Sequence, residues 1–309
     1  MTDAIEIRGL TKEYGRVHAL RRVDLTVPEG SIFGFLGPNG AGKTTTLRIL
    51  TGLARPTSGI VRVLGEKVTT AGNEVRARIG YLPDVPGFYD WMTAEELLRF
   101  AGALFGIESR TLDERVRVLL DLAGLTGVKS RVGGYSRGMR QRLGIAQALV
   151  NAPRLLMLDE PTSALDPMGR KEVLDMLASL RGRTTVLFST HILADVERIC
   201  DTVAVLDRGR VVAQAPIEEL KAPHGARRLV VEVPGGGDEF AELLAAEAWL
   251  STMERPERDV YALTVNDVLA AERAIPAAVA VLGLPMRRFE GAEVDLEQVF
   301  VDLVGGEER

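Results

Sequence analysis

The sequence contains a single cysteine, Cys200, and it lacks any long apolar run. One thiol cannot build a disulfide framework or a cysteine-based zinc site, which is typical of a protein kept in a reducing cytoplasm. No apolar stretch approaches the roughly 18 residues that span a bilayer. The first residues, MTDAIEIRGL, lack the basic stretch and apolar run of a signal peptide. Contact with a membrane is therefore expected only through a partner.

A strong charge of one sign is also lacking. The formal net charge is −5, so no global attraction to nucleic acid or to an anionic membrane surface is expected. The apolar fraction of 46% and the charged fraction of 26% are typical of a globular protein. A length of 309 residues is enough for one large domain or two of ordinary size.

The sequence GPNGAGKTT at residues 37–45 fits the phosphate-binding pattern G-x-x-x-x-G-K-[ST]. An apolar stretch over residues 31–36 predicts a buried strand before it, and residues 44–53 predict a helix after it. Glycines let the backbone approach phosphates closely, and N–H groups at a helix N-terminus face the anion. We expect Lys43 at the β- and γ-phosphates and the Thr44 hydroxyl on Mg²⁺. The predicted nucleotide-binding residues of this loop are Gly37, Asn39, Gly40, Ala41, Gly42, Lys43, Thr44 and Thr45.

A second motif, RLLMLDEP at residues 154–161, is an apolar strand that ends in two carboxylates. Side chains alternate along a strand, so Asp159 is expected to reach the Mg²⁺ while Glu160 does not. Glu160 is then free to act as a general base on water, a role worth about 10² to 10⁴ in rate. The two acidic residues could instead only begin a turn before Pro161. The phosphate loop upstream favours the catalytic interpretation.

Strands and helices alternate along the first two thirds of the chain, which predicts an α/β fold with a mainly parallel sheet. Residues 93–150 contain no convincing strand and predict a helical insertion. Two T-x-x-E sequences, at Thr93 and at Thr111, predict capping boxes at the start of helices in this block. The other expected strands cover residues 4–10, 19–27, 59–64, 79–82, 155–158, 185–189, 202–206 and 211–215, and the other helices cover 136–150, 167–180 and 192–199.

Residues 221–226 predict a linker, and the chain beyond them predicts a small separate α+β domain. The expected domains are residues 1–221 and residues 226–309. In the second, strands are expected at 228–233, 259–264 and 285–290, and helices at 238–247, 268–282 and 295–304, with Pro276 inside the second helix.

The order of these motifs resembles the ATP-binding subunit of an ABC transporter over roughly residues 4–220. The resemblance rests on the phosphate loop, the helical insertion, the Ser-x-Gly helix start at Ser136, the LLMLDEP strand, SALD at residues 163–166 and STH at residues 189–191. It implies a P-loop ATPase core with an antiparallel β subdomain. It also implies a head-to-tail dimer with two ATP molecules between the subunits, and hydrolysis coupled to transmembrane partner subunits.

The resemblance also implies roles for single residues. Ser136 and Gly138 would bind the nucleotide held by the other subunit, and Asp166 would touch that opposite site while it caps its own helix. His191 would contact the γ-phosphate and join Glu160 and Lys43 as a catalytic residue, although a lone histidine is more often structural. Tyr14, in an expected loop, would stack on adenine, although an aromatic residue in a loop often simply packs.

The sequence departs from the family pattern at two places. The usual helix start Leu-Ser-Gly-Gly-Gln is Tyr-Ser-Arg-Gly-Met at residues 135–139, so a bulky cation, Arg137, replaces a glycine. Asp84 stands where the family has a glutamine that reaches Mg²⁺ and the attacking water. The shorter carboxylate can still coordinate the metal, but it adds negative charge near the phosphates. The aromatic residues after it, Phe88, Tyr89 and Trp91, either pack the helical block onto the sheet or line a groove for a cytoplasmic helix of the membrane partner.

These departures and the ending DLEQVF at residues 295–300 resemble the bacterial exporter subgroup of the daunorubicin-resistance type. That subgroup implies separate permease chains, and a homodimer or a heterodimer at the inner face of the membrane. A DNA-associated ATPase would need a long coiled coil, and a ribosomal one usually has two modules. A regulatory nucleotide-binding subunit would be expected to lose Lys43, Glu160 or His191, and all three are present.

Overall fold

The computed structural model describes residues 3–68, 75–220 and 228–291 of the chain. The chain divides into two compact units, residues 1–217 and residues 218–309. The expected linker over 221–226 and the expected helix over 295–304 lie outside the described residues. Each unit contains its own buried apolar core, so each packs as a body in its own right.

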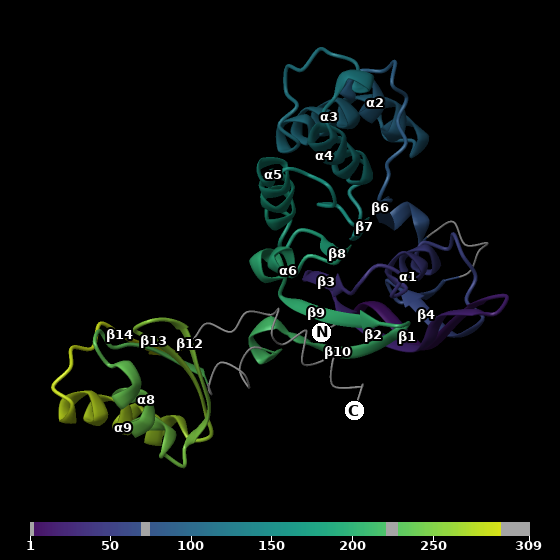
Figure 1. The fold of residues 1–309 in the computed structure, drawn as a ribbon. Helices are drawn as coiled ribbons and strands as arrows, with labels where there is room; N and C mark the ends of the chain where they lie inside the picture. Colours follow the sequence, from purple (N-terminus) through teal and green to yellow (C-terminus); the bar gives the residue numbers. More distant parts are fainter. Residues whose placement is uncertain (1–2, 69–74, 221–227, 292–309) are drawn as a thin grey trace. The chain divides into compact units, whose positions relative to one another are not determined.

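A six-stranded sheet of order β10-β9-β3-β8-β7-β6 forms the centre of the first unit (Figure 1). Its neighbouring strands pair in parallel, except that β10 returns antiparallel to β9. Every residue of β3, β7 and β8 is buried, as continuous apolar runs predict for strands covered on both faces. The strands are β3 (Ile32–Leu36), β6 (Ile79–Leu82), β7 (Leu155–Asp159), β8 (Thr185–Thr190), β9 (Thr202–Asp207) and β10 (Arg210–Pro216).

The two faces of this sheet pack into different cores, because successive side chains of a strand point to opposite faces. On β7, Leu156 joins the core formed with the helical block. Met157 joins the other core, which contains Leu47 and Leu50 of α1 (Lys43–Leu50). Asp159 continues the series of Met157 and therefore points to the α1 side, where the phosphate loop ends.

An antiparallel sheet of order β2-β1-β4-β5 belongs to the same unit. The Arg21 N–H on β2 donates to the Gly209 carbonyl in the turn between β9 and β10, at 2.7 Å, and so joins the two sheets. The first strand is longer than predicted and ends at Tyr14, so Tyr14 terminates a strand rather than lying in a loop. The strands are β1 (Asp3–Tyr14), β2 (Val17–Pro28), β4 (Ser58–Val63) and β5 (Glu66–Lys67).

The helical insertion predicted between β6 and β7 is present, and its helices lie together at one end of the unit (Figure 1). It contains α2 (Ala94–Leu104), α3 (Ser109–Leu122), the turn η2 (Val132–Gly134) and α4 (Arg137–Ala148). The unit also contains η1 (Arg76–Arg78), α5 (Pro167–Ala178) and α6 (Leu193–Ile199).

One of the two predicted capping boxes is confirmed and the other is wrong. Thr93 caps α2: its hydroxyl accepts from the Glu96 N–H at 3.3 Å, and the Glu96 carboxylate accepts from the Thr93 N–H at 2.8 Å. The helix α3 begins at Ser109 after Glu108, so Thr111 lies inside it and caps nothing. A T-x-x-E sequence therefore identifies a cap only where the threonine itself is extended and precedes the first turn, as Thr93 does.

The second unit has the element order β11-α8-β12-β13-α9-β14 and an antiparallel sheet of order β12-β13-β11-β14. This split βαβ arrangement is the ferredoxin-like one. Both helices pack on one face of the sheet, where Val231, Phe240 and Ile275 meet in a single core. The elements are β11 (Arg228–Glu232), α8 (Gly237–Ala245), β12 (Leu250–Glu257), β13 (Val260–Val265), α9 (Val268–Val281) and β14 (Arg288–Gly291).

The edge strand β12 was not predicted from the sequence. Most of its residues are exposed, and only Leu250 and Met253 are half-buried. Its sequence therefore shows no apolar alternation, and it contains Pro256, which is tolerated at a sheet edge. Pro276 does lie inside α9, as predicted.

Candidate functional site

The loop over residues 37–45 joins β3 to α1, and its glycines are required by the backbone. A Cβ at Gly37 would lie 2.2 Å from the Leu206 carbonyl oxygen. Gly42 has a φ of 113°, and a Cβ there would lie 2.6 Å from a Leu20 methyl group. Gly40 also has a positive φ, of 83°. This loop therefore packs against β2 and β9 more closely than any other residue type would allow.

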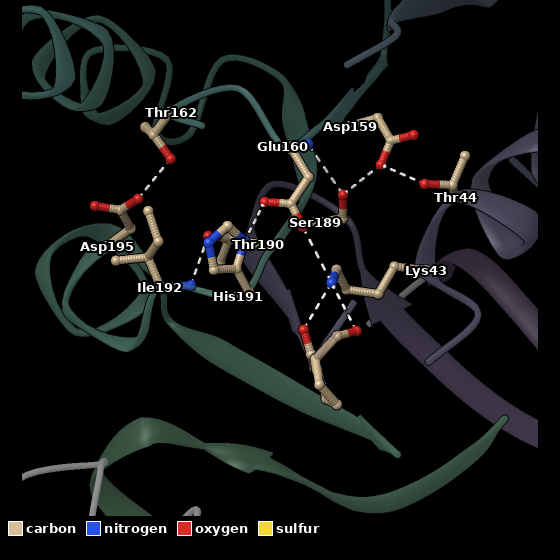
Figure 2. Close-up of polar contacts among 12 residues, drawn as sticks. Lys43, Thr44, Asp159, Glu160, Thr162, Ser189, Thr190, His191, Ile192 and Asp195 are labelled. Carbon is tan, nitrogen blue, oxygen red and sulfur yellow. Dashed lines mark hydrogen bonds and ion pairs between the residues drawn. The ribbon is translucent and has the colours of Figure 1, made fainter. Parts of the chain in front are cut away.

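The Lys43 ammonium group is buried at the centre of this loop. Its Nζ donates to the Gly37 carbonyl at 2.6 Å and to the Pro38 carbonyl at 3.2 Å, and it forms an ion pair with Glu160 Oε1 at 3.0 Å (Figure 2). Only 6% of the Lys43 side chain and 12% of the Glu160 side chain are exposed. A phosphate entering the loop must therefore take the place of Glu160 at Lys43.

The Asp159 carboxylate joins the phosphate loop to β8. Its Oδ1 accepts from the Thr44 hydroxyl at 3.1 Å and from the Ser189 hydroxyl at 2.7 Å. Burial raises the pKa of Asp159, the two hydroxyl bonds lower it, and the nearby carboxylates of Asp84 and Glu160 raise it, for a net increase. A poorly solvated carboxylate beside a hydroxyl has the chemistry of a divalent-cation site, because a cation would offset the cost of burying the charge.

Glu160 and His191 form a hydrogen-bonded pair at the ends of β7 and β8. The His191 Nδ1 lies 2.8 Å from Glu160 Oε2, so the Glu160 carboxylate bridges His191 and Lys43 (Figure 2). Glu160 has a φ of 49°, a left-handed conformation that costs a non-glycine residue of order 1 to 3 kcal/mol. Its N–H is held by both the carbonyl and the hydroxyl of Ser189, each at 3.1 Å. This geometry is typical of a strained functional residue held by its neighbours.

Asp84 and Tyr14, two further predicted site residues, both lie at the surface. Asp84 is exposed in the turn after β6, and its charge contributes to the raised pKa of Asp159. Tyr14 is 49% exposed, and the Lys12 ammonium lies 4.4 Å from the centre of its ring. An exposed ring with a cation on one face offers a surface for a flat aromatic group.

Ser136, Gly138 and Asp166 form a second group at the adjoining starts of α4 and α5. The Ser136 hydroxyl accepts from the Met139 N–H at 3.2 Å, and Asp166 Oδ1 accepts from the Gly169 N–H at 2.9 Å. The three residues line one cavity of about 340 Å³. In the part of the chain that the structure describes, no hydrogen bond or ion pair joins them to Lys43 or Glu160. The predicted site residues therefore fall into two groups.

Three residues with contacts at the site had no role assigned from the sequence: Thr162, Ser189 and Asp195. Ser189 lies opposite Asp159 in the register of β7 and β8, on the same side of the sheet. A polar residue near the end of an otherwise apolar strand is the one signal that could have identified it. Thr162, in the loop after β7, hydrogen-bonds to Asp195 in the first turn of α6, and no motif reports such a contact.

Comparison with known proteins places the chain in a family. Residues 20–163 match the model of the family described as ABC transporter. The chain is 41% identical to an uncharacterized ABC transporter ATP-binding protein of Bacillus subtilis, over 97% of this chain and 99% of that protein. It is 35% identical to a bacitracin transport ATP-binding protein of Bacillus licheniformis, over 99% of each. It is 37% identical to a daunorubicin/doxorubicin resistance ATP-binding protein of Streptomyces peucetius, over 98% of this chain and 93% of that protein.

Comparison with solved structures indicates the same family. An ATP-binding subunit of an ABC transporter matches with a TM-score of 0.65 and 31% identity, over 72% of this chain and 93% of that one. A dimeric ATP-binding cassette with ADP and Pi bound matches with a TM-score of 0.62 and 26% identity, over 69% and 98%. The chain belongs to the ATP-binding subunits of ABC transporters. It is an ATPase related to the bacitracin-transport and daunorubicin-resistance ATP-binding proteins.

Proposed function

We propose that this ATPase subunit dimerises head-to-tail on ATP and drives the export of a substrate through separate permease subunits. The observation that carries this proposal is the division of the phosphate-binding residues into two groups. Lys43 and Glu160 belong to one group, and Ser136 and Gly138 belong to the other. A second copy in head-to-tail orientation would bring its Ser136 group to the ATP held by Lys43. The dimeric form of a related cassette supports this arrangement.

Thr44 and Asp159 are the residues that would hold Mg²⁺, with Asp84 near enough to contribute through its charge. When bound, Mg²⁺ neutralises charge on the phosphate oxygens and orients them. Tyr14 would stack on the adenine ring, and the loop over residues 37–45 would surround the phosphates. A Cβ at Gly40 would meet no atom within 4 Å, so the backbone there is open to their approach.

Hydrolysis follows from the exchange of partners at Lys43. When ATP enters, its phosphates take the Lys43 ammonium, and the Glu160 carboxylate is released from the ion pair. Glu160 stays hydrogen-bonded to His191 through Oε2, so Oε1 can accept a proton from a water molecule. The water oxygen bonds to the γ-phosphorus while the bond from that phosphorus to the bridging oxygen breaks, which gives ADP and inorganic phosphate.

The membrane partner has a candidate contact surface next to Asp84. A cavity of about 280 Å³ lies between β6, α2 and α4, and Phe88, Leu104 and Phe105 line it. Tyr89 packs edge-on against Phe100, with 5.7 Å between ring centres, yet 49% of Tyr89 is exposed. We propose that a cytoplasmic helix of a permease occupies this groove.

The subunit would thereby sit at the inner face of the cell membrane, as a homodimer or as a heterodimer with a related ATPase subunit. Among the helices of the described residues, none combines the length and the apolarity needed to cross a bilayer. A permease, rather than nucleic acid, is the expected partner of a chain with a net charge of −5.

Glu160→Gln tests the assignment of the base. The variant should bind ATP, measured by equilibrium binding, and should lose turnover by about 10² or more, because glutamine accepts no proton. Glu29→Gln is the control. Glu29 pairs with Arg154 where β3 and β7 begin, whereas Lys43 and Glu160 follow the ends of these strands. Glu29→Gln should keep the wild-type rate. Hydrolysis by Glu160→Gln at the wild-type rate would show that another group is the base.

A further inference from the structure

The Asp195 carboxylate is buried four residues after His191. Asp195, in the first turn of α6, has no exposed surface. Its Oδ2 accepts from the Thr162 hydroxyl at 2.6 Å, and Thr162 is itself buried (Figure 2). Its Oδ1 accepts from Arg170 Nε at 2.5 Å. A charge buried this deeply is tolerated only when it is paired and hydrogen-bonded, and both conditions hold here.

The Thr162–Asp195 bond connects the two segments that carry the proposed catalytic pair. Thr162 follows Glu160 by two residues, and Asp195 follows His191 by four. The buried bond therefore joins the same two segments as the Glu160–His191 contact and the bonds from the Glu160 N–H to Ser189. The Thr162–Asp195 bond does not involve the Glu160 side chain, so it does not depend on which partner Glu160 has.

Arg170 extends this connection to a third segment. It lies in α5, and its N–H donates to the Asp166 carbonyl at 2.9 Å in the first turn of that helix. One carboxylate therefore holds the loop after β7, the start of α5 and the start of α6. These are the segments that carry Glu160, Asp166 and His191.

The loop that Asp195 holds is strained. Glu160 and Ala164 both have positive φ angles, of 49° and 52°. Such conformations persist only where surrounding contacts impose them. Ser189 fixes the Glu160 N–H on one side, and Thr162 is the next residue of the loop whose side chain is held by a buried hydrogen bond.

We propose that Asp195 is a positioning residue for hydrolysis and acts through Thr162. The bond between Thr162 and Asp195 sets the direction of the Glu160 carboxylate once the ATP phosphates have replaced this carboxylate at Lys43. Among the described residues, no hydrogen bond or ion pair joins Asp195 or Thr162 to the loop over residues 37–45, so their removal should slow the chemical step and leave ATP binding intact. This inference rests on the proposed role of Glu160 as the base.

Thr162→Val removes the hydroxyl at nearly constant volume. It should lower kcat about tenfold or more, because a misplacement of about 1 Å at a reacting group can cost as much as 10² in rate. The Kd for ATP should stay within about twofold of wild type, since the loop over residues 37–45 is untouched. Thr162→Ser restores the donor and should return kcat to within about threefold of wild type.

Thr184→Val is the matched control. Thr184 is also buried, and its hydroxyl donates to the Pro153 carbonyl at 2.7 Å, at the opposite end of β8. The control should lower the melting temperature as Thr162→Val does, but it should leave kcat within about twofold of wild type. All rates are measured well below the lowest melting temperature in the set.

Equal kcat values for Thr162→Val and Thr184→Val would overturn the proposal, as would a loss of ATP binding that matches the loss of kcat.

If Thr162→Val does not fold, Asp195→Asn answers the same question, because its amide oxygen still accepts from Thr162 while the charge facing Arg170 is lost. It should keep more activity than Asp195→Ala, and equal activities would contradict the proposal. Glu160→Gln separates the two ideas: if it is inactive while Thr162→Val is fully active, only the role of Asp195 fails.

Discussion

At the scale of a single residue, substitution of Tyr14 distinguishes a packing role of its ring from a role in binding adenine. It ends β1, and 49% of it is exposed, so its removal should cost little stability. Stacking of a base on an aromatic ring is worth about 1 to 3 kcal/mol. We therefore expect Tyr14→Ala to raise the KM for ATP about tenfold and to leave kcat and the melting temperature near wild type.

Tyr14→Trp is the control for that substitution, because it keeps a flat ring at the end of β1. It should retain a KM close to that of wild type. Steady-state kinetics over a range of ATP concentrations measures both variants. An unchanged KM in Tyr14→Ala would mean that adenine binds elsewhere.

The motifs predicted the residues of the candidate site but not all of their contacts. Lys43, Asp159, Glu160 and His191 were predicted because each stands at a fixed place in a known pattern. The Lys43–Glu160 ion pair was not predicted, because it joins two loops that only the order of the parallel strands brings together. The contacts of Asp195 depend in the same way on how α6 packs, which no local pattern reports.

At the scale of an element, the start of α2 shows a cap whose strength depends on pH. Two hydrogen bonds lower the pKa of the Glu96 carboxylate. The larger effect comes from the Thr93 N–H and the smaller one from the Thr93 hydroxyl. A carboxyl group with a lowered pKa stabilises the fold at pH values above its ordinary pKa. That stabilisation is lost as the pH falls through the lowered value.

Glu96→Gln should therefore melt at a lower temperature than wild type at pH 7, and the difference should close in acid. Thr93→Ala should be destabilised by about 0.5 to 2 kcal/mol at pH 7, the usual cost of a lost N-cap. Glu114→Gln is the matched control, because it has the same T-x-x-E sequence but lies inside α3 without a cap. Thermal melts at several pH values measure all three. A Glu96→Gln difference that grows as the pH falls would contradict this account.

Strands were most predictable where burial imposes an apolar pattern on the sequence. The buried strands β3, β7 and β8 were all predicted, because their apolar runs are continuous. The edge strand β12 was missed. Its hydrogen bonds to β13 stabilise it, and because most of its side chains are exposed, its sequence shows no apolar pattern. The false capping box in α3 has a related cause, since the helix began two residues earlier than the threonine that was expected to cap it.

At the scale of the whole molecule, the proposed head-to-tail dimer would make a single chain half of each of two sites, because the predicted site residues fall into two groups. The order of the motifs predicted the fold class, and the parallel sheet, the antiparallel sheet and the helical insertion are all present. The ferredoxin-like order of the second unit was not predicted, because it depends on β12. An experiment on mixed chains tests whether a second copy completes the site.

Two variants that damage different halves should restore each other. Lys43→Ala removes the phosphate ligand of one half. Gly138→Asp places a negative charge in the other half, and the chain has room for it, because a Cβ at Gly138 would lie 3.7 Å from its nearest neighbour, the Gly169 Cα. An acidic residue is also tolerated in the first turn of α4. Gly138→Ala, which adds the Cβ without the charge, should stay active and is the control for folding.

Each variant alone should be inactive, and an equal mixture should recover about a quarter of the wild-type rate, because half of the dimers are mixed and each has one complete site. A second mixture gives an independent measurement. Wild type mixed equally with the double variant Lys43→Ala/Gly138→Asp should fall to about a quarter of the wild-type rate, because mixed dimers then have no complete site. Chains that act alone would instead give about half the wild-type rate in the second mixture, and no recovery in the first. That pair of outcomes would exclude a site shared between two copies.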